Sequence, residues 1–427
     1  MNHIITTELD CGMPLLVEPI ANVASVALDW LLPLGSATDP AEGDGHAAML
    51  SELVFRGAGG LSSREHSDAL DRLGVQRSCR TRVHHLQIHF TLLGDRLVEA
   101  LPLLAMLVRE PALPAEAVDP VRSLCLQALD GLDDDPQHQV MLRLRERHLA
   151  PPFNRHGYGD RHVLETATAE ELRHAWFQRC LSDGSILASA GAVDPDGLAE
   201  GLNALLADFP RGHRDPIEVA APERGYLHIT QDTAQVHIGL AYDAPREADK
   251  HSMLERLAVA VLSGSTSGRL FTEVRQKRSL SYSVGASYQA GRDHGLVAMY
   301  AGTTPQRAQE TLEVCAAEIR RLRQGVQQSE FQRAVNGLKS HLIMQGESTP
   351  ARAAALATDH FRLGRARTLD DLAGAIDAIT CDELNAYLAR REFGNFTIVS
   401  IGSAALESSA SREGKISAPA EVPPGAG

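Results

Sequence analysis

The sequence predicts an α+β fold made of two similar domains, each a mostly antiparallel sheet packed with helices. Length is the first reason, because 427 residues exceed what one hydrophobic core usually serves and suit two domains of about 200 residues. The second reason is an internal repeat. Composition is the third, since 44% hydrophobic and 22% charged residues are typical of an ordinary globular protein.

The repeat consists of a strand, a proline turn, an acidic turn and a helix, in that order. The first copy runs from an apolar strand at 23–30 to a helical segment at 46–53. The second runs from a strand at 234–242 to a helical segment at 251–257. Both helical segments carry Met-Leu-x-x-Leu and begin 205 residues apart. This spacing agrees with the expected domain size and therefore predicts a duplicated domain.

The boundaries follow from composition. The stretch from Pro210 to Pro222 is rich in proline, glycine and charge, which is typical of a linker. We therefore expect a first domain at residues 1–212 and a second at 223–405. Residues 406–427 are rich in serine, alanine, proline and glycine, which predicts a disordered tail.

The charge balance limits the partners. Lys and Arg number 41 against 55 Asp and Glu, so the net charge is −14. An acidic surface repels phosphate backbones and anionic lipid, so we expect neither nucleic acid nor membrane as a partner, and a basic or neutral partner is easier to accommodate. No leader, no apolar run long enough to span a bilayer and no paired cysteine motif is visible, so we expect free thiols and a cytoplasmic protein.

The stretch 263–284 is the most informative part of the sequence. It begins with a small-residue loop that contains Gly264 and Gly268. No Gly-Lys-Ser/Thr follows, so this is not a phosphate-binding loop. The next residues predict a short helix whose apolar face is formed by Leu270, Phe271 and Val274.

Two polar side chains follow that apolar face. Arg275 lies beside it, and Tyr282 alternates with Leu280 and Val284 in a predicted strand. Tyr282 should therefore share a face with apolar neighbours while its hydroxyl needs a partner. A fixed arginine and a fixed phenol next to a cleft could bind a peptide carbonyl and stabilise an oxyanion. The alternative is a surface arginine and a core tyrosine.

This pattern resembles the second-domain motif of the insulinase family of zinc peptidases, which includes the processing peptidases. That motif is a small-residue loop, Arg-Leu-Phe, an acidic residue, an arginine and, seven residues later, a tyrosine that opens a strand. The order of elements is similar over nearly the whole chain, and residues 263–284 are the specific part. The resemblance implies two homologous domains in a clam-shell arrangement, with Arg275 and Tyr282 contacting the scissile carbonyl.

The resemblance also implies residues that bind substrate. Gln235 precedes an apolar strand, as a glutamine does in family members. Gly264 and Gly268 belong to a loop that, in the family, closes over the peptide cleft or packs between the domains.

The first half lacks the family's zinc ligands. Catalytic members carry His-x-x-Glu-His on a helix, where the two histidines bind zinc and the glutamate acts as a base. Aligned on the Phe-Arg-Gly that follows, these positions fall on Ala48, Ser51 and Glu52, and the distal glutamate falls near Gln127 or Ala128. Alanine has no donor atom, and one carboxylate cannot hold zinc alone. We therefore expect no metal and no cofactor in this chain.

The sequence thus predicts a non-catalytic, substrate-binding or regulatory subunit, inactive alone. Its expected partner is a zinc-binding subunit of the same family, forming a heterodimer in which Arg275 and Tyr282 act on a peptide substrate bound at the partner's zinc. Two alternatives stay open. One is a structural or assembly subunit without a peptidase role, and the other is a stand-alone peptidase with an atypical site.

Overall fold

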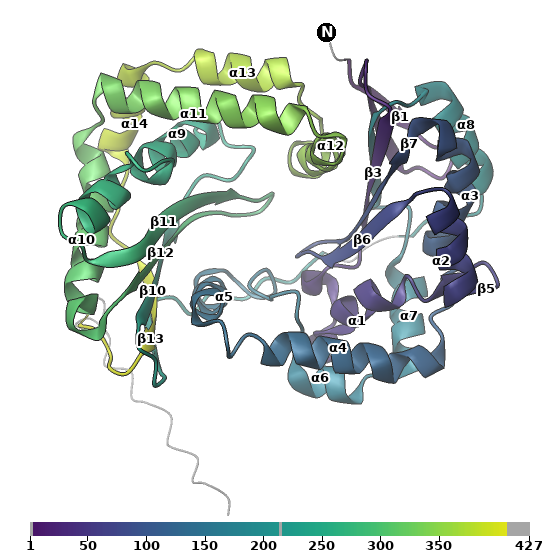
Figure 1. Ribbon diagram of the computed structural model, residues 1–427, viewed down its shortest axis with the longest axis horizontal. Helices are drawn as coiled ribbons and strands as arrows, with labels where there is room; N and C mark the ends of the chain where they lie inside the picture. The colour runs from purple at the N-terminus through teal and green to yellow at the C-terminus, as the bar shows by residue number, and fades with distance from the viewer. Residues whose placement is uncertain (1–2, 213–215, 408–427) are drawn as a thin grey trace, which may run out of the picture.

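The computed structural model describes residues 3–212 and 216–407, and the chain forms two halves that face each other (Figure 1). The first half contains, in chain order, β1 (Ile5–Glu8), β2 (Pro14–Pro19), β3 (Ser25–Leu32), α1 (His46–Leu53), β4 (Gly57–Ala58), β5 (Leu61–Ser62), α2 (Ser63–Arg72), β6 (Gln76–Thr81), β7 (Leu86–Leu93), α3 (Leu97–Arg109), α4 (Val118–Asp130), α5 (Pro136–His148), α6 (Arg161–Thr166), α7 (Ala169–Arg179), β8 (Ile186–Gly191) and α8 (Pro195–Leu205).

The second half contains β9 (Tyr226–Thr230), β10 (Val236–Asp243), α9 (Ser252–Ser263), a π-helical turn (Phe271–Gln276), β11 (Ser281–Ala290), β12 (Gly295–Thr303), α10 (Ala308–Arg321), α11 (Gln328–Gly346), α12 (Thr349–Leu363), α13 (Leu369–Asp377), α14 (Cys381–Arg390) and β13 (Thr397–Gly402).

The two large sheets share one topology. The strand order is β1-β2-β8-β3-β7-β6 in the first and β11-β12-β10-β13-β9 in the second. In the first sheet, β2 pairs in parallel with β8, the last strand of that half, and in the second sheet β9 pairs in parallel with β13, the last strand of its half. The other strand pairings within the two sheets are antiparallel. The expected α+β fold of two homologous domains in a clam-shell arrangement is therefore confirmed.

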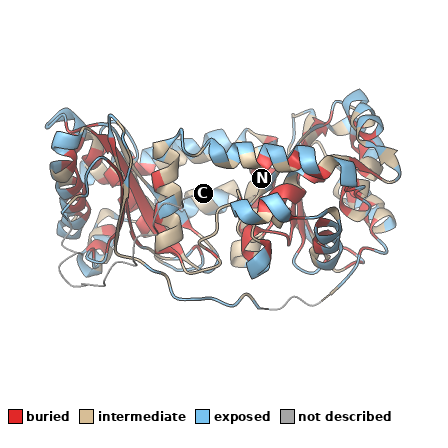
Figure 2. Ribbon diagram, turned by 90° about the horizontal axis from the view of Figure 1, so that it is seen from below, coloured by how far each residue is buried: buried red, intermediate tan, exposed pale blue. Residues whose placement is uncertain are grey.

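Each half has its own core on the outer face of its sheet. Buried residues of the first core run from Leu9 to Phe209, and those of the second run from Val236 to Ile398. Figure 2 shows the buried residues gathered in two blocks, one in each half. Alternating side chains of each strand point to opposite faces, so every central strand has a second apolar face to cover.

A helix from the opposite half covers that second face. Helix α5 contributes Val140 and Leu144 to a cluster with Ala298, Tyr300 and other residues of the second sheet. Helix α12 places Leu356 and Ala357 against the first sheet, on the buried residues Leu16, Leu31, Ile186 and Ala188. The two halves thus exchange helices (Figure 1).

The ends of α12 are set by local sequence. The Ser348 side chain accepts a hydrogen bond from the Ala351 backbone N–H, and Pro350 lies in the first turn, where a missing N–H costs nothing. Gly364 ends the helix with a left-handed φ of 71°, which favours glycine.

Two expectations fall partly outside the described residues. The predicted linker includes residues 213–215 and the predicted tail includes residues 408–427, neither of which the structure describes. The first two residues of the predicted tail are described: the Leu406 N–H donates to the Tyr226 hydroxyl at 2.7 Å, and the Glu407 N–H donates to the Gln309 side chain at 2.8 Å. Within 3–212 and 216–407, no helix has the length and apolar character needed to cross a membrane.

Candidate functional site

Helix α1 carries the positions where catalytic relatives bind zinc. Ala48 is buried, and the Ser51 hydroxyl donates to the Ala48 carbonyl at 2.7 Å. Glu52 is exposed on the same helix, and Ala128 is exposed on α4, which packs beside α1. A methyl group has no lone pair for a metal, and the Ser51 hydroxyl already has a partner. The residues present on α1 therefore do not fit a zinc ion.

Two cysteines flank these positions. Burial, with a smaller effect from the Glu52 carboxylate, raises the pKa of Cys125 to about 11, and the same two causes raise the pKa of Cys79 further. Loss of the proton, which zinc binding to a thiol requires, is therefore harder for both thiols than for an ordinary cysteine. Over the residues that the structure describes, no group of three or more His, Cys, Asp or Glu side chains has the geometry of a metal site.

Arg275 lies in the π-helical turn that follows the small-residue loop. Val274 is fully buried, whereas Arg275 is exposed and its guanidinium carbon lies 5.0 Å from the centre of the Phe271 ring. Contact with an aromatic face orients a guanidinium without neutralising it. Single π-helical turns are rare in proteins, and those that do occur are often found at functional sites. The turn therefore presents an oriented cation on the surface.

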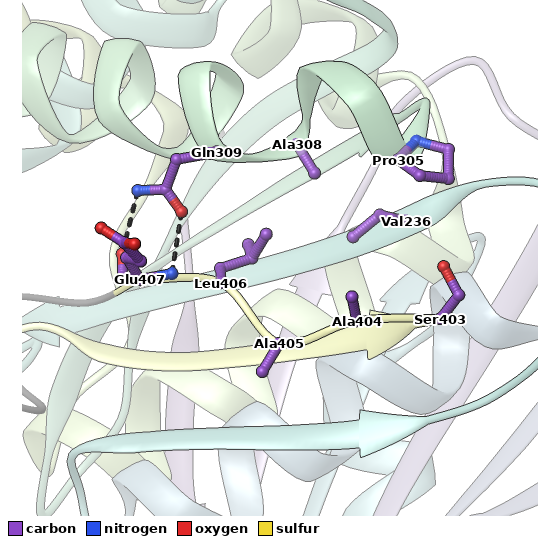
Figure 3. Close-up of a pocket in the computed structure, with 9 residues that line it drawn as sticks. All are labelled: Val236, Pro305, Ala308, Gln309, Ser403, Ala404, Ala405, Leu406 and Glu407. Carbon is purple, nitrogen blue, oxygen red and sulfur yellow. Dashed lines mark hydrogen bonds between the residues drawn. The ribbon is translucent and has the colours of Figure 1, made fainter.

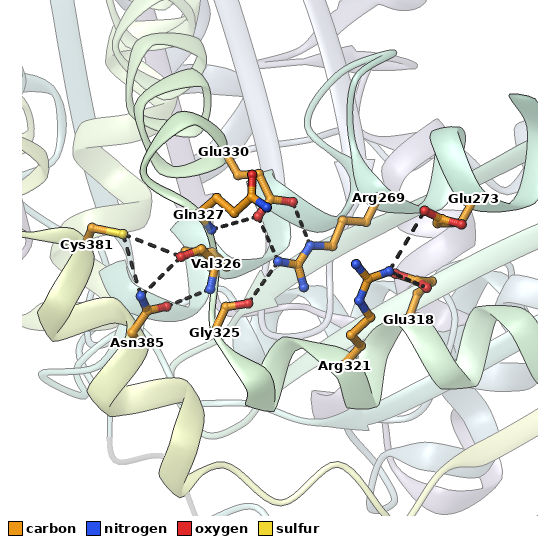
Figure 4. A network of polar contacts seen from close by, with 10 residues as sticks. All are labelled: Arg269, Glu273, Glu318, Arg321, Gly325, Val326, Gln327, Glu330, Cys381 and Asn385. Carbon is orange, nitrogen blue, oxygen red and sulfur yellow. Dashed lines mark hydrogen bonds and ion pairs between the residues drawn. The ribbon is translucent and has the colours of Figure 1, made fainter. Parts of the chain in front are cut away.

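Ion pairs hold this turn in place (Figure 4). The Arg269 guanidinium donates to both carboxylate oxygens of Glu330 at 2.8 Å, which fixes the start of the turn to α11. The Glu273 carboxylate pairs with Lys277 and Arg278, each at 2.7 Å. Hydrogen bonds from Lys277 and Arg278 lower the pKa of Glu273. The charges around Arg275 are thus paired with one another and leave Arg275 available.

Tyr282 is the extra residue of a β-bulge. Ser281 pairs with Thr303 and Ser283 pairs with Gly302, so Tyr282 has no partner across the strand. The Ser281 hydroxyl lies 2.6 Å from the Ser283 carbonyl and 2.7 Å from the Gly302 carbonyl, which closes the bulge. Strand β11 is at the edge of its sheet. Bulges at edges re-aim side chains and often lie next to active sites.

The predicted alternation of Leu280, Tyr282 and Val284 is therefore wrong. Leu280 is 4% exposed and Tyr282 is 70% exposed, so the two do not share a face. The bulge inserts one residue into the period of two, which turns Tyr282 to the solvent. The phenol needs no buried partner for this reason.

Gln235 lies at the same end of the second sheet. Gln235 directly precedes Val236 of β10. Thr303 of β12 pairs with Val236 on one side and with Ser281 of β11 on the other. Gln235 and Tyr282 are thus on strands separated only by β12. The turn that carries Arg275 is tied to the start of β11, because the Leu280 N–H donates a hydrogen bond to the Val274 carbonyl.

The two glycines lie in the loop that leads to Arg275. Gly264 ends α9 and is exposed, whereas Gly268 is buried where an added Cβ would lie 3.0 Å from the carbonyl oxygens of Leu262 and Ser265. Gly268 is therefore required by the close path of the backbone. The structure thus places Gln235 and Tyr282 at one end of the second sheet, with Arg275 in the turn that leads to this end and the two glycines in the loop before that turn.

A large cavity lies elsewhere, between the two halves. We call it the central chamber. It has a volume of about 1490 Å³ and is walled by β6, β7, the β11–β12 hairpin, α11 and α12. None of the predicted site residues lines it, so the cleft expected beside Arg275 and Tyr282 is not this chamber. Sequence reasoning missed the chamber residues, although the repeated arginines of 77–82 are a visible signal.

A smaller pocket of about 270 Å³ lies where the chain leaves β13 and passes α10 (Figure 3). The Gln309 amide group donates to the Glu407 carbonyl at 3.0 Å and accepts from the Glu407 N–H at 2.8 Å. Its lining contains no arginine, histidine or cysteine. The pocket is therefore the join between the last described residues and the second half.

The two duplicated domains that face a chamber define a clam-shell fold of two homologous halves. Residues 16–156 match the insulinase family, peptidase family M16, and residues 166–338 match the family described as the peptidase M16 inactive domain. The chain belongs to the insulinase family.

Three similar proteins illustrate the family. An uncharacterized zinc protease of Mycobacterium tuberculosis is 27% identical over 408 residues, which is 91% of each chain. The crystal structure of a peptidase M16 inactive domain from Pseudomonas fluorescens has a TM-score of 0.85 at 20% identity and covers 95% of this chain and 99% of its own. A chain of complex III from Candida albicans has a TM-score of 0.80 at 17% identity and covers 94% of this chain and 96% of its own. The two structures are similar in fold.

Proposed function

We propose that this chain is the non-catalytic subunit of a heteromeric insulinase-family peptidase. A partner of the same family holds the zinc, and this chain contributes Arg275 and Tyr282 to the peptide bound there. The partner's ion supplies the Lewis acid and the activated water. The Arg275 guanidinium and the Tyr282 hydroxyl donate hydrogen bonds to the peptide carbonyl oxygen as it gains charge.

One observation carries this proposal: a bulge and a π-helical turn expose a tyrosine and an arginine at one end of the second sheet, while α1 lacks the His-x-x-Glu-His set of zinc donors. A bulged, 70% exposed tyrosine has no role in the core of this chain. Its exposure fits a site whose other wall comes from a second molecule. Gln235 at the same end supports peptide binding there.

The free thiols support the compartment that we propose. All six cysteines are free, which is typical of a reducing compartment. We place the heterodimer in the cytoplasm on this ground.

The test is a reconstitution. The chain is co-expressed with a family member from the same genome that carries His-x-x-Glu-His, and cleavage of a peptide panel is measured. Arg275→Ala and Tyr282→Phe should each lower kcat by about 100-fold while the complex still forms on size exclusion. Arg333→Ala is the matched control, because Arg333 is also exposed in the second half. Full activity of both variants would contradict the proposal.

A structural or assembly subunit is the second candidate. It is supported by the similar fold of a chain in Candida albicans complex III. Under this reading, Arg275→Ala and Tyr282→Phe change no activity of any assembly that contains the chain. A stand-alone peptidase is the third candidate, and cleavage by the purified chain with added zinc would support it against both others.

A further inference from the structure

The central chamber has a charge opposite to that of the whole chain. Eight arginines and two carboxylates line it, namely Arg77, Arg80, Arg82, Arg145, Arg256, Arg292, Arg362 and Arg367 against Glu247 and Asp359. The whole chain has a net charge of −14. Charges more than about 8 Å apart are largely screened at physiological salt, so the nearby arginines decide the potential inside the chamber.

The two chamber carboxylates are already paired. Glu247 accepts from Arg256 and from Arg367, each at 2.9 Å, and Asp359 accepts from Arg367 at 2.6 Å. Both acids are buried. They form ion pairs with Arg256 and Arg367, and they also attract Arg362 from farther away, which partly offsets the effect of burial on its pKa.

Five chamber arginines form no ion pair with a described carboxylate. Within 3–212 and 216–407, no carboxylate oxygen lies within the 4.0 Å of an ion pair from Arg80, Arg82, Arg145, Arg292 or Arg362. Two of them contact neutral groups: the Arg82 Nε donates to the Gln87 side chain at 2.8 Å, and Arg292 lies over the Phe361 ring at 5.2 Å.

Partial desolvation disfavours the charged form of three of these arginines. Desolvation lowers the pKa of Arg145 and Arg362, and for Arg82 the like charge of Arg80 adds to desolvation. A group whose charged form is disfavoured gains most from an anionic partner. Arg77, by contrast, already pairs with Asp71 at 2.9 Å.

The arginines are spread over separate walls. Arg80 and Arg82 lie on and just after β6, Arg145 on α5, Arg292 in the β11–β12 hairpin and Arg362 on α12. A single phosphate needs donors that converge on one point, and this arrangement instead suits several separate anionic groups along one chain. Apolar side chains line the same chamber, among others Leu31, Met253, Leu342 and Phe361.

We propose that the central chamber binds an acidic peptide, whose aspartate and glutamate side chains pair with Arg80, Arg82, Arg145, Arg292 and Arg362. The volume of about 1490 Å³ exceeds that of an ordinary small-molecule site, which is about 300–1,000 Å³. This inference names the substrate class, and it rests on the proposed function for the later cleavage of the peptide. Binding itself involves neither Arg275 nor Tyr282.

The experiment measures binding to the full chain alone. Fluorescence anisotropy is recorded with a labelled Asp/Glu-rich peptide, with the same peptide in Asn/Gln form and with a lysine-rich peptide. The acidic peptide should bind at least about tenfold tighter than the other two, and its binding should weaken as salt rises. Equal binding of the three peptides would overturn the inference.

Substitutions locate the site. Arg80→Gln and Arg292→Gln change exposed side chains, so both variants should fold, and each should weaken acidic-peptide binding about tenfold. Arg77→Gln is the matched control, because Arg77 lines the same chamber but is paired with Asp71. Unchanged binding in the Arg80→Gln, Arg292→Gln double variant would contradict the proposal.

A single-stranded oligonucleotide of equal charge is the competing ligand. If it binds as tightly as the peptide and depends on the same arginines, the chamber is a general polyanion site and the proposal is wrong. The outcome is separate from that of the reconstitution, because loss of kcat in Arg275→Ala does not require the chamber arginines.

Discussion

Arg352 of α12 binds Glu18 of β2 across the two halves of the molecule. Its Nε and Nη2 atoms lie 2.8 and 2.5 Å from the same carboxylate oxygen, and the two side chains are 3% and 0% exposed. A buried ion pair contributes orientation more than net stability, but removing one partner is costly. This pair fixes the register of α12 on the first sheet.

Arg352→Met should therefore destabilise the protein by about 3 kcal/mol. Methionine fills much of the volume but leaves the Glu18 carboxylate without this cation in a buried place. Urea unfolding followed by circular dichroism measures the change. Arg365→Met, which changes an exposed arginine just beyond α12, should lie within about 0.5 kcal/mol of the parent, and an equal midpoint for Arg352→Met would refute the role of the pair.

Ser281→Ala should release the bulge that exposes Tyr282. The substitution removes the hydroxyl that lies 2.6 Å and 2.7 Å from two carbonyls, at a cost of about 1 kcal/mol in unfolding free energy. In the reconstituted peptidase, kcat should fall while KM stays the same, because the phenol is misplaced rather than lost. Ser283→Ala is the control, because it removes an exposed hydroxyl two residues further on. A parallel fall of kcat in both variants would point to a general disturbance instead.

His294 should make stability fall in mild acid. Burial, and then the nearby Arg145, lowers the pKa of His294 from 6.5 to about 4. As pH falls below about 6.5, the unfolded chain takes up a proton that the folded chain refuses, so stability decreases until about pH 4. His294→Asn should therefore gain about 1–2 kcal/mol relative to the parent at the acidic end only, with solvent screening included.

Denaturation of the parent and His294→Asn at pH 7.5 and 4.5 checks this expectation. His341→Asn changes an exposed histidine of the same chamber and should not reproduce the effect. A difference between parent and variant that is independent of pH would contradict it.

Zinc should not stabilise this chain. A ligand that binds the folded state raises its unfolding temperature, and α1 offers Ala48, an engaged Ser51 and one exposed carboxylate. We expect the melting temperature to be the same with zinc and with chelator, and dialysed protein to hold far less than one zinc per chain by elemental analysis. One retained equivalent that Glu52→Gln abolishes would reverse this conclusion.

The duplicated fold was predictable because it rests on local patterns. The apolar strands that became β3 and β10, each followed by a Met-Leu-x-x-Leu helix, are visible in the sequence. The exposure of Tyr282 was not, because the bulge depends on a hydrogen bond between Ser281 and Gly302, which lie 21 residues apart. Local alternation carries no information about such a contact.

The chamber could not be predicted from the sequence for a similar reason. Its arginines come from segments as distant as β6 and α12, and only the fold brings them together. Net charge alone favoured a basic or neutral partner, whereas the chamber favours an acidic one. A sum over the chain cannot show how charges are distributed between the outer surface and an internal wall.

The exchange of helices between the halves has a consequence for synthesis on the ribosome. The inner face of the first sheet stays open until Leu363, the last residue of α12, has left the exit tunnel. Until then, the apolar side of α5 is also exposed, because it packs on strands of the second sheet that are translated later. Neither half can finish on its own, so the nascent chain needs protection from aggregation for most of its translation, and a gene cut at the linker should yield two insoluble fragments.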